Sequence, residues 1–179
     1  MLWQGEELDR LLDRDHAQIV ESVLRLLAGT HWTGVPEVTF QIDRERGSID
    51  ILAWHPASST LLVIEIKSVV PDVQATLSGV DRKARLAPQI ARDRGWQVRS
   101  VARVLVLPDQ RTARRRVEAF SATFDRAFPA RTAEIKRWLA APGEALAGIL
   151  FLSDLRATQP RQRVGAASRW VTHESARRP

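Results

Sequence analysis

The residues of this sequence best suited to chemistry are Asp50, Glu65 and Lys67. Asp50 closes the segment Gly-Ser-Ile-Asp, and Glu65 and Lys67 belong to the segment Leu-Val-Ile-Glu-Ile-Lys. Successive side chains of a strand point to opposite faces, so Glu65 and Lys67 share one face. An unpaired charge buried in so apolar a strand would cost several kcal/mol, so these charges need a partner, a metal ion or water. Two carboxylates and an ammonium that meet in this way could bind a metal ion and activate water.

The scarcity of lysine supports a chemical role for Lys67. Of 27 basic residues, only Lys67, Lys83 and Lys136 are lysines. A chain that uses arginine elsewhere keeps at position 67 a compact ammonium whose pKa can be tuned. The alternatives are that this lysine survives by chance, or that it forms a surface ion pair with Glu65 or Asp50. A surface pair contributes only about 0 to 1 kcal/mol, which gives little reason to interrupt a core strand.

Composition excludes several classes of protein. A hydrophobic content of 44% excludes wholesale disorder, and no apolar run reaches the ~20 residues of a membrane-spanning helix. Cysteine is absent, which excludes disulfides, thiolate zinc sites and cysteine nucleophiles. Any metal ion must therefore bind oxygen or imidazole ligands, and carboxylate sites favour Mg²⁺ or Mn²⁺. The net charge of +6 favours a polyanionic partner.

The length of 179 residues suits one domain with a loose end. We expect the domain to span residues 1–153 and to be followed by a flexible basic tail, 154–179, whose hydrophobic anchor is Trp170-Val171. The first residues have neither the basic flank nor the apolar stretch of a signal peptide, so we expect a cytoplasmic protein.

The first half of the chain is expected to form a helix and a three-stranded meander. Apolar residues recur at helical spacing from about Gly5 to Ala28, and Gly29 follows as a stop. Alternating and continuous apolar runs then predict three strands, joined by turns at 45–47 and 55–60. The predicted strands are Val35 to Ile42, Ile49 to Trp54 and Leu61 to Lys67.

The second half is expected to add helices and two strands. Asp72 is a candidate N-cap for a helix that runs to about Arg94, and Pro88 is expected to kink or split it. The apolar run Val101 to Leu107 suits a buried strand that lies parallel to the third and is reached by a right-handed crossover. Further helices are predicted at 109–128 and 132–140, and a last strand at 147–152. The fold class is α/β, with a mixed central sheet flanked by helices.

The αβββαβ order, with an acidic residue at the second strand and Glu-x-Lys in the third, resembles the PD-(D/E)XK nuclease superfamily, also called restriction-endonuclease-like. Asp50 matches the Asp of the motif, Glu65 its acidic residue and Lys67 its Lys, while Ser48-Ile49 stands in place of its Pro. The resemblance covers roughly residues 5–108 and implies a restriction-endonuclease-like core. More narrowly, the stretch 45–86 looks like a bacterial group often found behind a helix-turn-helix domain. A separate targeting protein or domain is therefore a candidate partner.

The resemblance implies a metal-dependent nuclease. Asp50, Glu65 and the backbone carbonyl of Ile66 would hold Mg²⁺ or Mn²⁺ together with water. The metal ion would lower the pKa of bound water and neutralise the phosphate. Lys67 would position or help deprotonate the attacking water and offset the developing charge.

Three further residues are candidates for this site or for the solvated surface. Many relatives carry another acid on the first helix, but Glu21 falls opposite the apolar stripe and is expected to face solvent. His16 falls within the stripe and is interpreted either as a core histidine or as a site residue. Gln74, at the start of the second helix, could reach the site or a phosphate, or face solvent.

Two basic clusters are candidates for phosphate contacts, with solvated helix faces as the alternative. They consist of Arg82, Lys83 and Arg85 in the second helix and of Arg111, Arg114, Arg115 and Arg116 in the next. DNA is the expected partner, a homodimer is a candidate assembly, and no membrane partner is expected. The alternative to a DNA nuclease is a regulatory DNA-binding protein that keeps the nuclease fold without cleavage. An RNA-directed nuclease also remains open, because phosphate chemistry is shared.

Overall fold

The computed structural model describes the backbone of residues 3–153 and the side chains of residues 13–153. The segment 154–179, which we expected to form a basic tail, lies outside the described residues. No helix within 3–153 is long and apolar enough to cross a membrane.

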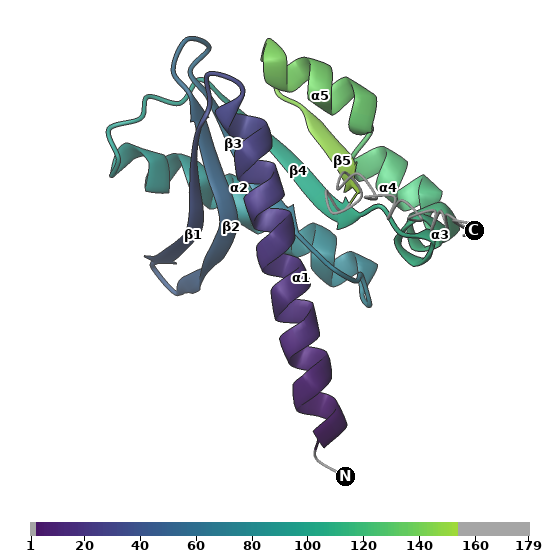
Figure 1. Cartoon of the computed structure of the whole chain (residues 1–179). Helices are drawn as coiled ribbons and strands as arrows, with labels where there is room; N and C mark the ends of the chain where they lie inside the picture. Colours follow the sequence, from purple (N-terminus) through teal and green to yellow (C-terminus); the bar gives the residue numbers. More distant parts are fainter. Residues whose placement is uncertain (1–2, 154–179) are drawn as a thin grey trace, which may run out of the picture.

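A five-stranded mixed sheet forms the centre of the protein (Figure 1). The strands lie side by side in the order in which they occur in the sequence. The first three are antiparallel neighbours, whereas the third, fourth and fifth run parallel. They are β1 (Thr33–Ile42), β2 (Glu45–His55), β3 (Thr60–Ile66), β4 (Ser100–Pro108) and β5 (Ala147–Leu152). The predicted meander and the parallel pairing of the third and fourth strands are confirmed.

Helices cover both faces of this sheet, which makes the protein α/β as expected. On one face, α1 (Trp3–Ala28) and α5 (Thr132–Ala140) share a hydrophobic core with β2, β3 and β4. On the other, α2 (Val73–Arg92), α3 (Arg111–Ala119) and α4 (Ser121–Ala127) supply the helical side of two further cores. Figure 1 shows α1 crossing one side of the sheet and α2 lying behind it.

β3 is buried along its whole length, because it has a strand on each side and helices on both faces. Leu62, Ile64 and Ile66 contribute to the core beneath α1, and Leu61 and Val63 to the core beneath α2. By the alternation of a strand, Glu65 belongs to the α2 side. The sheet thus buries a carboxylate in its most completely buried strand.

The hairpin between β1 and β2 turns earlier than predicted. The turn comprises Asp43 and Arg44, and the residues 45–47 that we interpreted as a turn continue β2. Gly47 lies beside the ring of Phe40, where a Cβ atom would approach Phe40 Cζ to 3.0 Å. The glycine therefore makes room for an aromatic side chain, and it does not mark the turn.

Two helix predictions also differ from the structure. α2 is not split at Pro88 but continues to Arg92, because Leu86, Ala87, Ile90 and Ala91 keep the last turns packed against the sheet. The helix predicted for 109–128 is instead two helices, which meet at Phe120, where the backbone leaves the helical region (φ −120°, ψ 31°). Asp72 caps α2 as expected, since its carboxylate accepts from the Ala75 N–H at 2.9 Å.

In both β1 and β2, the alternation of side chains between the two faces of the sheet is interrupted near Asp50. Leu52 and Ile49, three residues apart, both face the α2 side, so the alternation of β2 is interrupted between them. Opposite this point, Glu37 of β1 has a positive φ of 50°. The pairing of β1 with β2 skips Glu37 and Asp50, and the pairing of β2 with β3 ends before Asp50. Asp50 is therefore paired with neither neighbouring strand.

Candidate active site

The side chain of Asp50 lies where β2 separates from β3. The ladder between these strands ends at the pair Ile51 and Ile64. Beyond it, the Ile66 N–H donates a hydrogen bond to Asp50 Oδ2 at 2.6 Å. The carboxylate thus takes the place of a backbone carbonyl that a continuing strand would have supplied. This bond fixes Asp50 beside the segment that carries Glu65 and Lys67.

Glu65 is paired with two lysines. Its carboxylate is buried, with 4% of the residue exposed. Oε1 lies 2.9 Å from Nζ of Lys67, and Oε2 accepts a hydrogen bond from Nζ of Lys83, which comes from α2. Asp50, Glu65 and Lys67, which the sequence analysis singled out, are therefore brought together, and Lys83 joins them.

The pKa of Asp50 is raised above its ordinary value of 3.8. Burial is the main cause, and the negative charge of Glu65 adds to it. The hydrogen bond from Ile66 and the positive charges of Lys83 and His16 act in the opposite direction without reversing the shift. The two carboxylates therefore repel each other, and a bound cation would relieve this repulsion.

The pKa of Lys67 is raised above its ordinary value. Burial favours the neutral amine, but the hydrogen bond to Glu65 and the negative charges of Glu65 and Asp50 outweigh that effect. Lys67 is thus a cation in this arrangement. It can donate hydrogen bonds to a phosphate or to water, and it could accept a proton only after losing one of its own.

His16 and Glu21 of the first helix differ in burial. His16 is partly buried on α1, and its charge is the weakest of the influences that lower the pKa of Asp50, so its roles as a core histidine and as a site residue both stay predictions. Glu21 is exposed and pairs at 3.7 Å with Arg25 one turn later. The expectation that Glu21 faces solvent is confirmed.

Three of the four predicted residues of α2 lie at the surface. Gln74 is exposed in the first turn, and Arg82 is exposed next to Lys83. The guanidinium of Arg85 donates two hydrogen bonds of 2.8 Å from one nitrogen to the carboxylate of Glu45, at the start of β2. Lys83 alone among them is buried, at 9% exposure, and its ammonium binds Glu65 instead of projecting toward a ligand.

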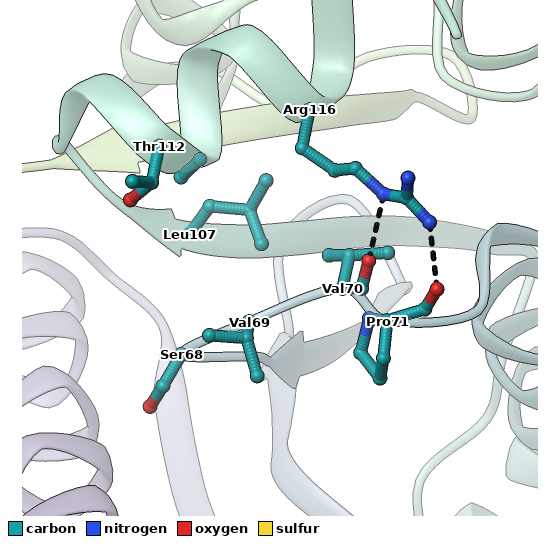
Figure 2. Close-up of a pocket in the computed structure, with 8 residues that line it drawn as sticks. Ser68, Val69, Val70, Pro71, Leu107, Thr112 and Arg116 are labelled. Atoms are coloured by element: carbon teal, nitrogen blue, oxygen red, sulfur yellow. Dashed lines mark hydrogen bonds between the residues drawn. The ribbon is translucent and has the colours of Figure 1, made fainter. Parts of the chain in front are cut away.

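The arginines of α3 differ in what they contact. Arg111 and Arg115 are exposed. Arg114 pairs with Asp109 and lies over the ring of Phe151 at 4.5 Å. Arg116 donates to the carbonyl of Val70 at 2.9 Å and to that of Pro71 at 2.6 Å (Figure 2). It therefore holds the segment that joins β3 to α2.

A cavity of about 380 Å³ lies next to this segment (Figure 2). The residues that directly follow Lys67 form one wall, and α3 with the end of β4 forms the other. The lining residues are Ser68, Val69, Val70, Pro71, Leu107, Thr112, Ala113 and Arg116. Its walls are mainly aliphatic, which suits part of a larger ligand better than a phosphate alone.

The donor set suits a hard divalent cation. Asp50 engages the Ile66 N–H through Oδ2, which leaves Oδ1 for a cation, and the Ile66 carbonyl belongs to the same short segment. Glu65 can offer Oε1 when Lys67 gives it up. Within residues 13–153, no group of three or more His, Asp or Glu side chains is close enough to hold a metal ion. A metal ion would thus rely on two carboxylates, a carbonyl and water, a set that Mg²⁺ accepts.

Sequence reasoning did not place Lys83 in the site, although two signals pointed there. Lys83 is one of only three lysines. It also falls on the apolar stripe of α2, three residues after Val80 and four before Ala87, both of which are buried. A lysine on the buried face of a helix needs an acidic partner, and Glu65 is the carboxylate that the neighbouring strand presents.

Comparisons with protein-family models, curated proteins and solved structures found no match for this chain. Its function has to be inferred from the chemistry of the site.

Proposed function

We propose that this protein is a metal-dependent nuclease that hydrolyses phosphodiester bonds of DNA. The observation that carries the proposal is the meeting of Asp50, Glu65 and Lys67 at the point where β2 leaves β3. Burial and mutual repulsion of carboxylates at one place are typical of a site that takes a cation.

The fold supports the same assignment in its details. The order α1, β1, β2, β3, α2, β4 and the change from antiparallel to parallel pairing at β3 are those expected of a restriction-endonuclease-like core. Asp50 and Glu65 are distant in the sequence but close in space, because β2 and β3 are direct neighbours. A cytoplasmic location fits a protein that acts on DNA.

In this mechanism, Asp50, Glu65 and the Ile66 carbonyl would hold the metal ion. Bound Mg²⁺ or Mn²⁺ lowers the pKa of water and neutralises charge on the phosphate. Lys67 orients the water that attacks phosphorus and donates a hydrogen bond to a phosphate oxygen, whose negative charge grows as the water oxygen bonds to phosphorus. The attacking water gives up its proton to the solvent, and the leaving oxygen takes up a proton from water as its bond to phosphorus breaks.

The exposed arginines supply candidate contacts to the DNA backbone. Arg82 lies next to Lys83 in the sequence, and Arg111 and Arg115 lie on α3, whose Arg116 holds the segment after Lys67. Guanidinium groups in such positions fix the register of a duplex without reading its sequence. A second copy of the chain or a targeting protein would then supply selectivity.

The test is incubation of the purified chain with linear, circular and single-stranded DNA in Mg²⁺, Mn²⁺ or EDTA. Cleavage that requires the metal ion and disappears in Asp50→Asn is the expected result. Cutting of circles would identify an endonuclease, and loss of ends alone an exonuclease. Lys136→Gln, which removes a charge on the exposed face of α5, is the control and should cleave normally. Metal-independent cleavage, or cleavage by Asp50→Asn equal to wild type, would contradict the proposal.

One observation favours a second function, a DNA-binding protein of nuclease fold that does not cleave. Both oxygens of Glu65 are engaged by lysines, which lowers the negative charge available to a cation. Sequence-independent DNA binding that EDTA leaves unchanged, together with no cleavage in any metal ion, would favour this alternative.

A further inference from the structure

The two lysines that bind Glu65 are held very differently. Lys83 is buried, and it projects from a helix whose neighbouring residues Val80, Leu86 and Ala87 pack against the sheet. The side chain of Lys67 is 41% exposed and follows the last residue of β3. One lysine is therefore fixed by packing, whereas the other can turn toward water.

The costs of breaking the two pairs differ for the same reason. Separation of Lys83 from Glu65 would leave two buried charges without partners, which is strongly unfavourable. Separation of Lys67 frees an ammonium that is 41% exposed and that water can solvate, while Glu65 stays paired with Lys83, so it costs less. Oε1 is thus the oxygen of Glu65 that can change partner, and Oε2 the oxygen that cannot.

We propose that Lys83 is a positioning residue that fixes Glu65 through Oε2, and that Oε1 exchanges the ammonium of Lys67 for a divalent cation. This inference rests on the cation site of the proposed function. It makes Lys67 a competitor of the cation before binding, and a free ammonium beside the site after binding.

The balance of charges gives this exchange a consequence for the substrate. Two carboxylates and two ammoniums sum to zero formal charge when Asp50 is ionised, so an added divalent cation leaves a surplus of positive charge. An anionic phosphodiester reduces that surplus, and the released Lys67 can donate to it. Cation and phosphate are therefore expected to bind more tightly together than apart.

Lysine labelled with ¹³C at Cε tests the exchange in the unmodified protein. The chain contains three lysines, so three signals are expected, and each is assigned with a Lys→Met variant. Titration with Mg²⁺ should move the Lys67 signal toward that of exposed Lys136 and leave the Lys83 signal in place. A Lys67 signal that does not respond to bound Mg²⁺, or a Lys83 signal that moves instead, would overturn the inference.

Binding of Mn²⁺, measured by electron paramagnetic resonance, separates the roles of the two lysines. Lys67→Met removes the competitor and should tighten binding about fivefold, the order expected for one exposed ion pair. Lys83→Met removes the same charge but also the anchor of Glu65, so it should leave the affinity unchanged or weaker. Lys136→Met, an identical change on exposed α5, should match wild type. An equal gain in Mn²⁺ affinity in Lys67→Met and Lys83→Met would show that both lysines act only through their charge, and it would overturn the positioning role of Lys83.

These outcomes are independent of cleavage. Cleavage of DNA in Mg²⁺ while Lys67 stays bound to Glu65 would contradict the exchange and support the proposed nuclease. Exchange without cleavage would support the inference and contradict the nuclease. A wild-type chain that binds no cation contradicts both. Should Lys83→Met fail to fold, the lysine spectrum of the wild-type protein still decides.

Discussion

The two ends of β3 both hold buried polar groups, but they are built on different principles. At the carboxyl end lies the carboxylate–lysine cluster, formed by Asp50, Glu65, Lys67 and Lys83. At the amino end lies the hydroxyl cluster, formed by His55, Ser58, Thr60 and Ser100. Ser58 Oγ lies 2.9 Å from His55 Nδ1 and donates to Thr60 Oγ1 at 2.8 Å, and Thr60 Oγ1 lies 3.0 Å from Ser100 Oγ.

The hydroxyl cluster is a chain of neutral groups. Burial lowers the pKa of His55, and the nearby His31 lowers it further, so the imidazole is neutral at physiological pH. Each hydroxyl has a partner, and the chain ties the turn after β2 to β3 and β4. Such a network stabilises a structure without creating reactivity.

The carboxylate–lysine cluster has a different balance, because its charges compete for partners. Asp50 and Glu65 repel each other, and two lysines share one carboxylate. Burial of polar groups is common to both ends of β3, so burial alone does not identify a site. Charges that compete for partners occur at the carboxyl end alone of the two, and they make that end the candidate site.

The largest expected effect is that of Glu65→Ala. The substitution should abolish cleavage and lower the free energy of unfolding by about 3–5 kcal/mol, because Lys83 would be left buried without its partner. Chemical denaturation measures the loss. The double variant Glu65→Ala with Lys83→Met should recover much of the stability but none of the cleavage. A single variant as stable as wild type would show that Lys83 does not depend on Glu65.

Thr60→Val tests the hydroxyl cluster with a smaller effect. The substitution keeps the shape but leaves the hydroxyls of Ser58 and Ser100 without their shared partner, which should cost about 1–3 kcal/mol in chemical denaturation. Cleavage should stay at the wild-type rate, because this end of β3 takes no part in the chemistry. Loss of cleavage in a folded Thr60→Val protein would erase the distinction between the two ends.

Asp50→Asn should change how stability depends on pH. Because folding raises the pKa of Asp50 above 3.8, the folded protein binds this proton more tightly than the unfolded chain does. The contribution of Asp50 to stability therefore falls as the pH rises through 3.8 and the raised pKa. The variant lacks this titration, so its stability relative to wild type should increase from acid to neutral pH in thermal unfolding. A pH-independent difference would show that Asp50 is not under this repulsion.

The smallest effects are expected at the arginines outside both clusters. The double variant Arg111→Ala and Arg115→Ala should weaken DNA binding uniformly across sequences. The salt dependence of binding should flatten by about 0.9 in log–log slope for each phosphate that the variant no longer neutralises. Arg116→Ala should instead lower stability, because Arg116 holds the carbonyls of Val70 and Pro71. An unchanged slope in the double variant would show that Arg111 and Arg115 of α3 do not contact DNA phosphates.

Local patterns predicted much of the fold. The bounds of α5 and β5 match their predictions, because local patterns define them: α5 places Ile135 and Leu139 four residues apart on one face, and β5 is a short apolar run. The break between α3 and α4 at Phe120 contains no glycine or proline, so the sequence did not indicate it. The turn at Asp43 was missed because Gly47 suggested a turn a few residues later. Both features depend on packing between segments, and local sequence patterns do not show which segments pack together.

Some residues of the candidate site could be predicted from local patterns, and others could not. Asp50, Glu65 and Lys67 could be predicted because neighbouring strands in a meander bring such residues together. The role of Lys83 depends on which face of α2 meets β3, and its charged neighbours Arg82 and Arg85 suggested a surface cluster. Arg116 likewise looked like a phosphate contact until its two backbone carbonyl partners were known.

The separation of β2 from β3 at Asp50 has a mechanical consequence. Beyond this point β2 pairs only with β1, and a two-stranded ribbon twists and bends more readily than a full sheet. Asp50 lies at the hinge of this arm, whereas Glu65 lies in the stiff sheet. Arg85 ties the arm to α2 through Glu45 near its tip, and α2 also carries Lys83. The arm is also packed along its length, because Val38, Phe40 and Ile49 belong to the core beneath α2. The spacing of the two carboxylates is therefore held by the seating of the hairpin on α2 as well as by the bond from Ile66.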